Sequence, residues 1–161
     1  MQYDYVIVGG GSAGCVLANR LSANPNNRVC LLEAGPSDDS LLVTMPAGII
    51  ALMRSNKRNW RYYTTPQKHL NNRESYIPRG KTLGGSSSIN AMVYTRGHKW
   101  DYDHWASLGC AGWGWGEMGR RFVELEDHPL GESEWRGIGG PLKISMHPSG
   151  NPLCEAVLDA A

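Results

Sequence analysis

The sequence predicts an α/β fold built on a parallel sheet, and the first 35 residues carry that prediction. Residues 3–8 form an apolar run rich in β-branched and aromatic side chains, typical of a strand buried on both faces of a parallel sheet. A glycine-rich loop, a segment with helical spacing and a second apolar run at 28–33 follow in order. A strand, a helix and a second strand in this order indicate a Rossmann-like βαβ unit.

The loop after the first strand has the spacing of a dinucleotide-binding motif. Gly9, Gly11 and Gly14 satisfy G-x-G-x-x-G. The first glycine allows a tight turn, the second lets the backbone approach a pyrophosphate, and the third lets the helix pack closely on the strand. Apolar residues at helical spacing continue through 12–21, so the loop should open a helix whose free N–H groups favour phosphate.

The second strand is expected to end on an acid that could bind a ribose. A turn cluster at 24–27 precedes it, and Glu33 follows Gly14 by 19 residues. A carboxylate at this place can accept hydrogen bonds from a ribose diol. The alternative is a glycine-rich turn with a surface glutamate, but the complete order of elements favours a nucleotide. The motif does not separate FAD from NAD.

Composition limits the classes of partner. The chain of 161 residues can bury a core, and its 16 basic residues against 15 acidic ones, without a basic run, argue against nucleic acid. The first expected strand leaves no room for a signal peptide.

The four cysteines lie apart, with no C-x-x-C pair, which indicates free thiols in a reducing cytoplasm. No metal site is expected.

The segment 41–53 is apolar but has only 13 residues and is interrupted by Pro46, so it is too short to span a membrane. Packing on the domain is the favoured interpretation, and lining a substrate entrance is the alternative. Further along the chain we expect a loop at 35–40, a helix at 117–126, a strand at 142–145 and a helix begun by Asn151 and Pro152.

A second glycine-rich segment, 80–90, reads Gly-Lys-Thr-Leu-Gly-Gly-Ser-Ser-Ser-Ile-Asn. Its glycines allow close backbone approach, and Arg79 and Lys81 add positive charge. A flexible linker is the alternative. A linker would not usually run straight into apolar residues that are expected to be buried, and here these are Ile89, Met92, Val93 and Tyr94. We therefore interpret the segment as a second place where backbone meets a cofactor.

Three segments together, 3–21, 29–35 and 79–105, resemble the glucose–methanol–choline (GMC) flavin oxidoreductases, in particular their choline dehydrogenase and alcohol dehydrogenase branch. The likeness covers nearly the whole chain but only the N-terminal third or so of a family member. The resemblance implies that 1–161 is the N-terminal part of a Rossmann-like FAD-binding domain, incomplete here. Residues 1–35 would be its βαβ unit and 79–105 its flavin-contacting segment, with the substrate domain outside the chain.

The resemblance also implies the cofactor site. The pyrophosphate of FAD would lie on Gly9, Gly11, Ser12, Ala13 and Gly14. Glu33 would hold the adenosine ribose, with Ala34 beside it. The flavin and its ribityl chain would lie along Gly85, Ser86, Asn90, Ala91, Met92 and Val93, with Trp60 near the flavin on weaker grounds. FAD should be non-covalent, because Ile89 stands where some relatives carry a flavin-linked histidine.

The activity implied is oxidation of a primary alcohol, choline-like or aliphatic, by hydride transfer to flavin N5. Electrons would pass to an acceptor other than oxygen, such as a quinone, in the cytoplasm or peripherally at the inner face of the membrane. No catalytic residue is expected in this chain, because none of its histidines stands in a matching motif; they are His69, His98, His104, His128 and His147. The chain alone should then be inactive. The alternative is a non-catalytic dinucleotide-binding module or the product of a decayed gene.

Overall fold

The computed structural model describes residues 2–146 and 150–161, so His147 lies outside the described part. The chain divides into two compact units, Met1–Val93 and Tyr94–Ala161, and each is described by itself. The segment 79–105 crosses the boundary between them.

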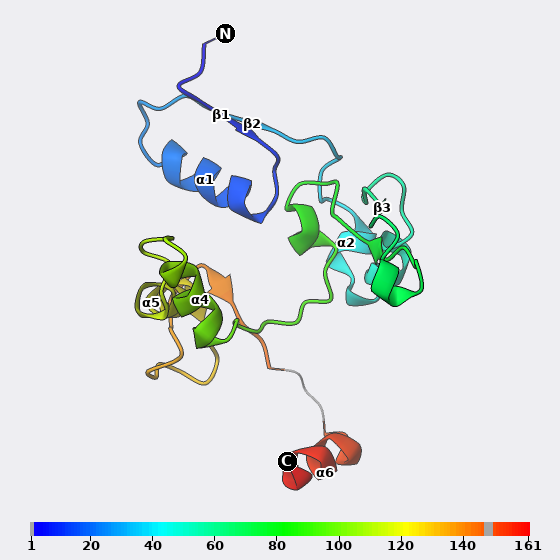
Figure 1. Cartoon of the computed structure of the whole chain (residues 1–161). Coiled ribbons are helices and arrows are strands. Elements are labelled where there is room, and N and C mark those ends of the chain that lie inside the picture. Colours follow the sequence, from blue (N-terminus) through cyan, green and yellow to red (C-terminus); the bar gives the residue numbers. More distant parts are fainter. Residues whose placement is uncertain (1, 147–149) are drawn as a thin grey trace. The chain divides into compact units, whose positions relative to one another are not determined.

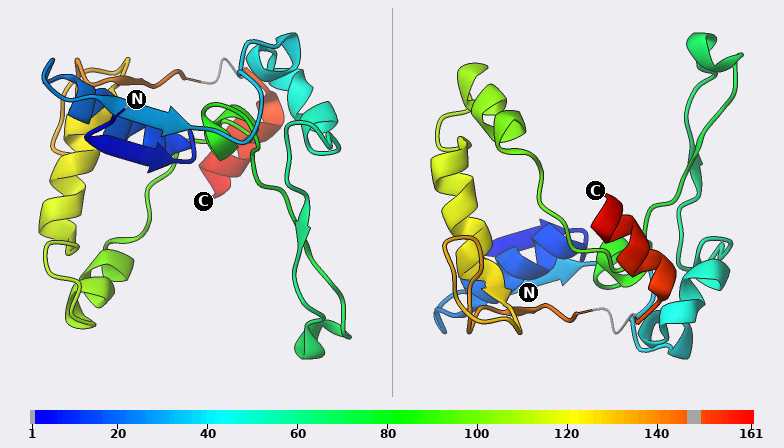
Figure 2. Two further views of the ribbon diagram at one scale, coloured as in Figure 1. Left: turned by 90° about the horizontal axis from the view of Figure 1, so that it is seen from above. Right: turned by 90° about the horizontal axis from the view of Figure 1, so that it is seen from below.

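The first unit begins with the expected βαβ arrangement. Strand β1 (Tyr5–Val8), helix α1 (Ser12–Ser22) and strand β2 (Val29–Leu32) follow one another, and the strands pair in parallel, with Tyr5 opposite Val29. Helix α1 lies along one face of the strand pair (Figures 1 and 2). This confirms the α/β fold class.

The strands are less buried than their composition predicts. Val6, Val8 and Leu32 are 56%, 84% and 50% exposed. The expectation of burial on both faces is wrong for this chain, because β1 and β2 form a two-stranded sheet and α1 packs along one face of it (Figure 1).

The apolar segment 41–53 folds into three short helices. These are α2 (Leu41–Thr44), the 3₁₀ helix η1 (Pro46–Gly48) and α3 (Ile49–Leu52). Leu52 is 2% exposed, so part of the segment packs inward as expected. Across the described ranges, no helix is long and apolar enough to cross a membrane.

Residues 59–80 form a long excursion that returns on itself (Figure 2). Strands β3 (Tyr62–Tyr63) and β4 (Tyr76–Ile77) pair antiparallel, with the 3₁₀ helix η2 (Lys68–Leu70) between them.

Asn59 organises the base of this excursion. It is 2% exposed, and its amide group donates to the carbonyl of Met53 at 3.1 Å and to the hydroxyl of Tyr76 at 2.9 Å. Its oxygen accepts from the backbone N–H of Arg79 at 3.0 Å. Because every polar atom of this buried side chain has a partner, the base of the excursion is held firmly. The 3₁₀ helix η3 (Gly85–Ser88) follows.

The second unit contains α4 (Lys99–Ser107), α5 (Trp115–Leu125), the parallel pair β5 (Glu126–Asp127) and β6 (Leu142–Lys143), and α6 (Pro152–Ala160). The helix expected at 117–126 is therefore confirmed, with a start two residues earlier. Asn151 caps α6, since its side chain accepts from the N–H of Leu153 at 3.0 Å. The strand expected at 142–145 is only two residues long.

An aromatic cluster fills the space between α4 and α5. The Tyr102 ring is 8% exposed and lies 5.4 Å from Trp105, 5.6 Å from Trp115 and 5.6 Å from Phe122, measured between ring centroids. Edge-to-face and tilted geometries of this kind stabilise aromatic clusters.

A buried ion pair joins the start of the second unit to β5. Arg96 contacts the carboxylate of Glu126, which is 2% exposed and also accepts from the N–H of Gly137 at 3.2 Å. Burial alone would raise the pKa of Glu126. Hydrogen bonds from Tyr94, Arg96 and Gly137, with the charge of Arg96, outweigh burial and hold that pKa below its ordinary value.

Three residues after the glycine-rich segment differ from expectation. Ile89 is 4% exposed as expected, but Met92, Val93 and Tyr94 are 60%, 78% and 39% exposed. The physical reason is that 91–97 connects the two units without forming a helix or strand, so these side chains have no element to pack within.

Candidate functional site

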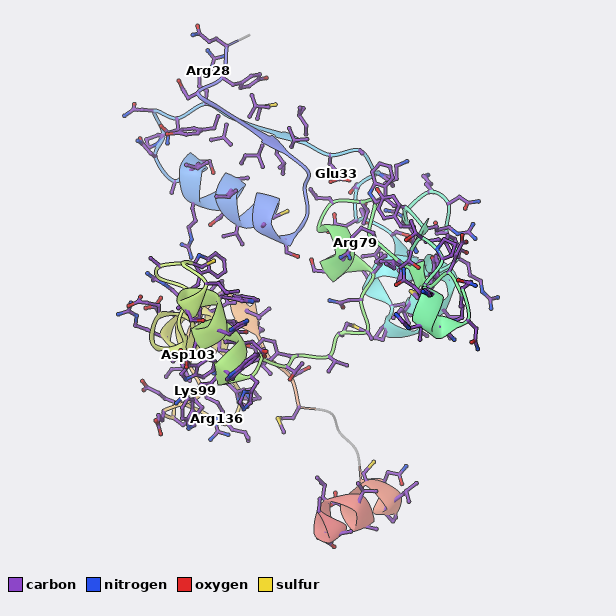
Figure 3. All side chains as sticks on the ribbon, in the orientation of Figure 1. Arg28, Glu33, Arg79, Lys99, Asp103 and Arg136 are labelled. Atoms are coloured by element: carbon purple, nitrogen blue, oxygen red, sulfur yellow. The ribbon has the colours of Figure 1, made fainter. Side chains whose placement is uncertain are left out.

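A groove of about 810 Å³ lies at the carboxyl ends of β1 and β2. One wall is the loop 9–14 with the start of α1, and the facing wall is the segment 79–86. Figure 3 labels Glu33, at the end of β2, and Arg79, on the facing segment. In open α/β sheets, ligands bind at this carboxyl end of the strands. The lining residues comprise Ile7, Val8, Gly9, Gly11, Ser12, Ala13, Gly14, Leu17, Leu32, Glu33, Ala34, Trp60, Arg79, Gly80, Gly85 and Ser86.

The first wall has the geometry of a phosphate loop. Gly9 has φ +98°, a left-handed conformation that favours glycine. A Cβ on Gly14 would overlap the carbonyl oxygen of Gly9, so only glycine lets α1 pack this close to the strand. Helix α1 begins after Gly11 with no side chain capping its first turn. Its first N–H groups therefore remain available to an anion.

The two glycine-rich segments touch through their backbones. The N–H of Gly84 donates to the carbonyl of Gly10 at 2.7 Å, and Gly11 forms a parallel bridge with Gly84. A Cβ on Gly85 would lie 2.8 Å from the Cα of Gly11, and Gly85 has φ +58°. A side chain at position 85 would therefore separate the two walls. The interpretation of 80–90 as a linker is wrong.

Glu33 lies between the walls at the end of β2. Its Oε2 accepts from the N–H of Gly10 at 2.7 Å, and its Oε1 accepts from the N–H of Gly35 at 2.8 Å. Each carboxylate oxygen can accept a further hydrogen bond. The residue is therefore oriented by the backbone and can still bind a hydroxyl donor in the groove.

One side of the groove carries an aromatic and cationic group. Trp60 is 42% exposed, and its backbone N–H donates to the backbone carbonyl of Arg79 at 2.8 Å. The ammonium of Lys81 lies 4.5 Å from the centroid of the Trp60 ring, and the Tyr62 ring stacks on Trp60 at 6.0 Å. Trp60 and Arg79 thus add a flat ring and a positive charge to a groove whose other lining residues are mostly glycines, small side chains and aliphatic side chains.

A second, smaller cavity of about 200 Å³ lies beyond η3. Gly85 and Ser86 line the first groove, whereas Ser87 and Ser88 line the second cavity, so η3 is a wall of both. The lining of the second cavity is mostly apolar. It consists of Leu42, Val43, Met45, Pro46, Ile49, Leu52, Ile89 and Met92, with Ser87, Ser88 and Asn90.

The structure brings nine of the expected site residues to one groove and leaves four outside it. Those in the groove are Gly9, Gly11, Ser12, Ala13, Gly14, Glu33, Ala34, Gly85 and Ser86. Asn90 and Met92 line the second cavity, while Ala91 and Val93 line neither and are exposed. Arg79 and Gly80 also line the groove; they belong to the segment 79–105 that was expected to contact the flavin, although neither was named as a site residue.

Within the described ranges, no group of residues could hold a metal ion. Three of the described histidines have structural partners, and one of them is His128, whose Nδ1 accepts from the backbone N–H of Leu130 at 3.2 Å. The ring of His98 caps α4 by accepting from the N–H of Trp100 at 3.1 Å, and the His104 ring stacks on Trp100 at 4.7 Å.

Comparison with known proteins agrees with this geometry. The sequence profile of the GMC oxidoreductase family matches residues 3–161. The chain belongs to the GMC oxidoreductase family. Its fold is that of the N-terminal part of the GMC FAD-binding domain, which is Rossmann-like.

Among curated GMC relatives, the chain is 54% identical over 160 residues to an alcohol dehydrogenase [acceptor] of Pseudomonas putida, covering 99% of this chain and 29% of that protein. It is 46% identical over 166 residues to the mitochondrial choline dehydrogenase of Homo sapiens, covering 99% of this chain and 28% of that protein. The chain therefore spans less than a third of the length of these relatives.

Among solved structures, it is similar to pyridoxine 4-oxidase from Mesorbium loti, with TM-score 0.89, 42% identity and coverage of 99% of this chain and 31% of that chain. It is also similar to a formate oxidase from Aspergillus oryzae in which FAD modification was studied. That match has TM-score 0.82, 33% identity and coverage of 98% of this chain and 30% of that chain.

Proposed function

We propose that this chain forms the FAD-binding part of a flavoenzyme that oxidises a primary alcohol. The observation that carries the proposal is the groove built by Gly9–Gly14 on one side and Gly80–Ser86 on the other. Bound FAD would supply a flavin ring that accepts a hydride from the alcohol carbon.

The residues of the groove fit this cofactor. The uncapped first turn of α1 suits a pyrophosphate, and the close approach of Gly11 to Gly85 keeps that space free of side chains. Glu33 would accept from the hydroxyls of the adenosine ribose. Arg79 would add positive charge near the phosphates, and Trp60 would offer a face on which a flat ring can pack.

The alcohol would be choline-like or aliphatic, since the similar proteins include an alcohol dehydrogenase [acceptor] and a choline dehydrogenase. The name of the Pseudomonas putida relative supports an alcohol as the substrate and a separate electron acceptor, which that name does not specify. We propose a quinone for that role, reached from the cytoplasm by peripheral contact with the inner face of the membrane.

The cofactor assignment is tested by titrating the protein with FAD and with NAD, following flavin fluorescence and heat of binding. Saturable binding of FAD, with NAD much weaker, is expected. Binding of NAD without binding of FAD would refute the proposal.

Bound flavin should be dissociable. Ile89 is 4% exposed and has no nucleophilic atom, so it cannot form a bond to the flavin. Precipitating the FAD-loaded protein with acid should leave the yellow colour in the supernatant. Flavin that stays with the pellet after washing in denaturant would contradict this expectation.

A further inference from the structure

Glu33 has two backbone partners before any ligand is present. Its carboxylate accepts from Gly10 at 2.7 Å and from Gly35 at 2.8 Å, and the residue is half-buried. Hydrogen bonds to a charged acceptor are roughly twice as strong as those between neutral groups. The side chain therefore ties the phosphate loop to the turn that follows β2.

Both of these amides belong to residues packed against the opposite wall of the groove. The carbonyl of Gly10 accepts from the N–H of Gly84 at 2.7 Å, and a Cβ on Gly10 would lie 3.0 Å from the Leu83 Cδ1. A Cβ on Gly35 would overlap the carbonyl oxygen of Lys81. The carboxylate therefore holds two residues whose positions set the distance between the walls.

We propose that Glu33 is a positioning residue: by holding Gly10 and Gly35, it sets the shape of the pyrophosphate site in addition to its role at the ribose. The identity of the ligand rests on the proposed function, but the two hydrogen bonds belong to the ligand-free protein. A glutamine at this position has only one accepting oxygen, and its NH₂ group would face a backbone N–H. In Glu33→Gln, one of the two amides therefore loses its acceptor.

The direction in which Glu33→Gln changes the binding of an anion distinguishes the positioning role from two others. In one of these Glu33 acts only through its charge, and in the other it acts only on the ribose. Removing a negative charge beside an anion site should tighten anion binding through Coulomb attraction alone. If Glu33 acted only on the ribose, inorganic pyrophosphate, which has no ribose, would bind Glu33→Gln as well as or better than it binds the unmodified protein. A positioning role predicts the opposite, because the loop that binds the phosphates loses its fixed shape.

The first measurement is amide hydrogen exchange by NMR in the ligand-free chain. In Glu33→Gln, exchange at Gly10 or Gly35 should accelerate by about tenfold, the effect of losing one hydrogen bond to a charged acceptor. The amide of Gly137, which donates to Glu126 at 3.2 Å in the other unit, is the internal reference and should not change. Glu74→Gln, the same change at an exposed glutamate, is the matched control. Unchanged exchange at both Gly10 and Gly35 would overturn the inference.

The second measurement is calorimetric titration with inorganic pyrophosphate and with ADP. Weaker binding of both ligands to Glu33→Gln supports the positioning role, whereas weaker binding of ADP alone would overturn it. If the unmodified chain binds neither these ligands nor FAD, the proposed function fails. The exchange measurement still decides the inference, because it needs no ligand. Faster exchange at Gly137 as well would show general unfolding. In that case Glu33→Asp gives the deciding comparison of exchange rates, because an aspartate side chain is too short to reach both amides.

Discussion

Gly11→Val is expected to abolish retention of FAD while leaving the protein folded. Gly11 has φ −76° and ψ −173°, which any residue can adopt, and the nearest atom to an added Cβ is the Gly85 Cα at 4.0 Å. A valine therefore meets little strain from its own backbone. Its branched side chain would occupy the space through which the backbone of Gly11 approaches the pyrophosphate.

The expected loss of affinity is large. The valine side chain would take the space of the pyrophosphate and block its hydrogen bonds to the loop, so the dissociation constant for FAD should rise at least roughly 100-fold. Titration with FAD gives the affinity, and circular dichroism during heating tests the fold. Gly116→Val is the matched control, because no atom lies within 4 Å of a Cβ added there, in the other unit. Normal FAD affinity in Gly11→Val would show that the pyrophosphate is placed wrongly.

Glu126→Gln should destabilise the second unit by about 3 kcal/mol, since removing one partner of a buried ion pair leaves an uncompensated charge on the other. Arg96 would remain with its side chain only 15% exposed. Glu124→Gln is the control: Glu124 pairs with Arg121 at 2.8 Å on the exposed surface of α5, where such a pair contributes at most about 1 kcal/mol. Urea unfolding followed by tryptophan fluorescence measures both. Equal losses in the two variants would mean that burial does not strengthen the Arg96–Glu126 pair.

The same ion pair predicts sensitivity to acid. The pKa of Glu126 in the folded chain lies below the ordinary value of 4.5, so its contribution to stability is complete at neutral pH. That contribution is lost as the pH falls below 4.5 and through the folded pKa. Urea midpoints measured from pH 7 down to about pH 3 should fall more steeply for the unmodified protein than for Glu126→Gln. Parallel pH profiles would contradict the assignment.

The parts of the fold that sequence predicts well are those in which local pattern and tertiary structure agree. The glycine motif needs only a strand before it and a helix after it, and neighbouring residues in the sequence encode both. Its glycines are Gly9, Gly11 and Gly14. Helix α4 was not anticipated, because its stability comes from the cap at His98 and from Tyr102 packing on α5, and not from an apolar stripe. The exposure of Val8 could not be read from composition, because burial depends on neighbouring strands that the local sequence does not contain.

The candidate site also has parts that the sequence predicts and parts that depend on tertiary contacts. Glu33 is found from its distance to the glycine motif, but its bonds to Gly10 and Gly35 depend on how three loops meet. Arg79 is placed in the groove by the buried amide of Asn59, which lies 20 residues earlier in the sequence. Contacts that depend on such a distant, satisfied polar residue leave no periodic pattern in the sequence.

The bridge between Gly11 and Gly84 also affects the order of folding. It joins residues 73 positions apart, whereas β1 and β2 pair residues 24 positions apart. Closing a longer loop costs more chain entropy, so the βαβ unit should form before the second wall docks on it. At a synthesis rate of about 5–20 residues per second, the first glycine loop leaves the ribosome several seconds before its partner. The groove therefore begins at the N-terminus but is completed late, and the nascent chain should acquire its cofactor only after η3 has emerged.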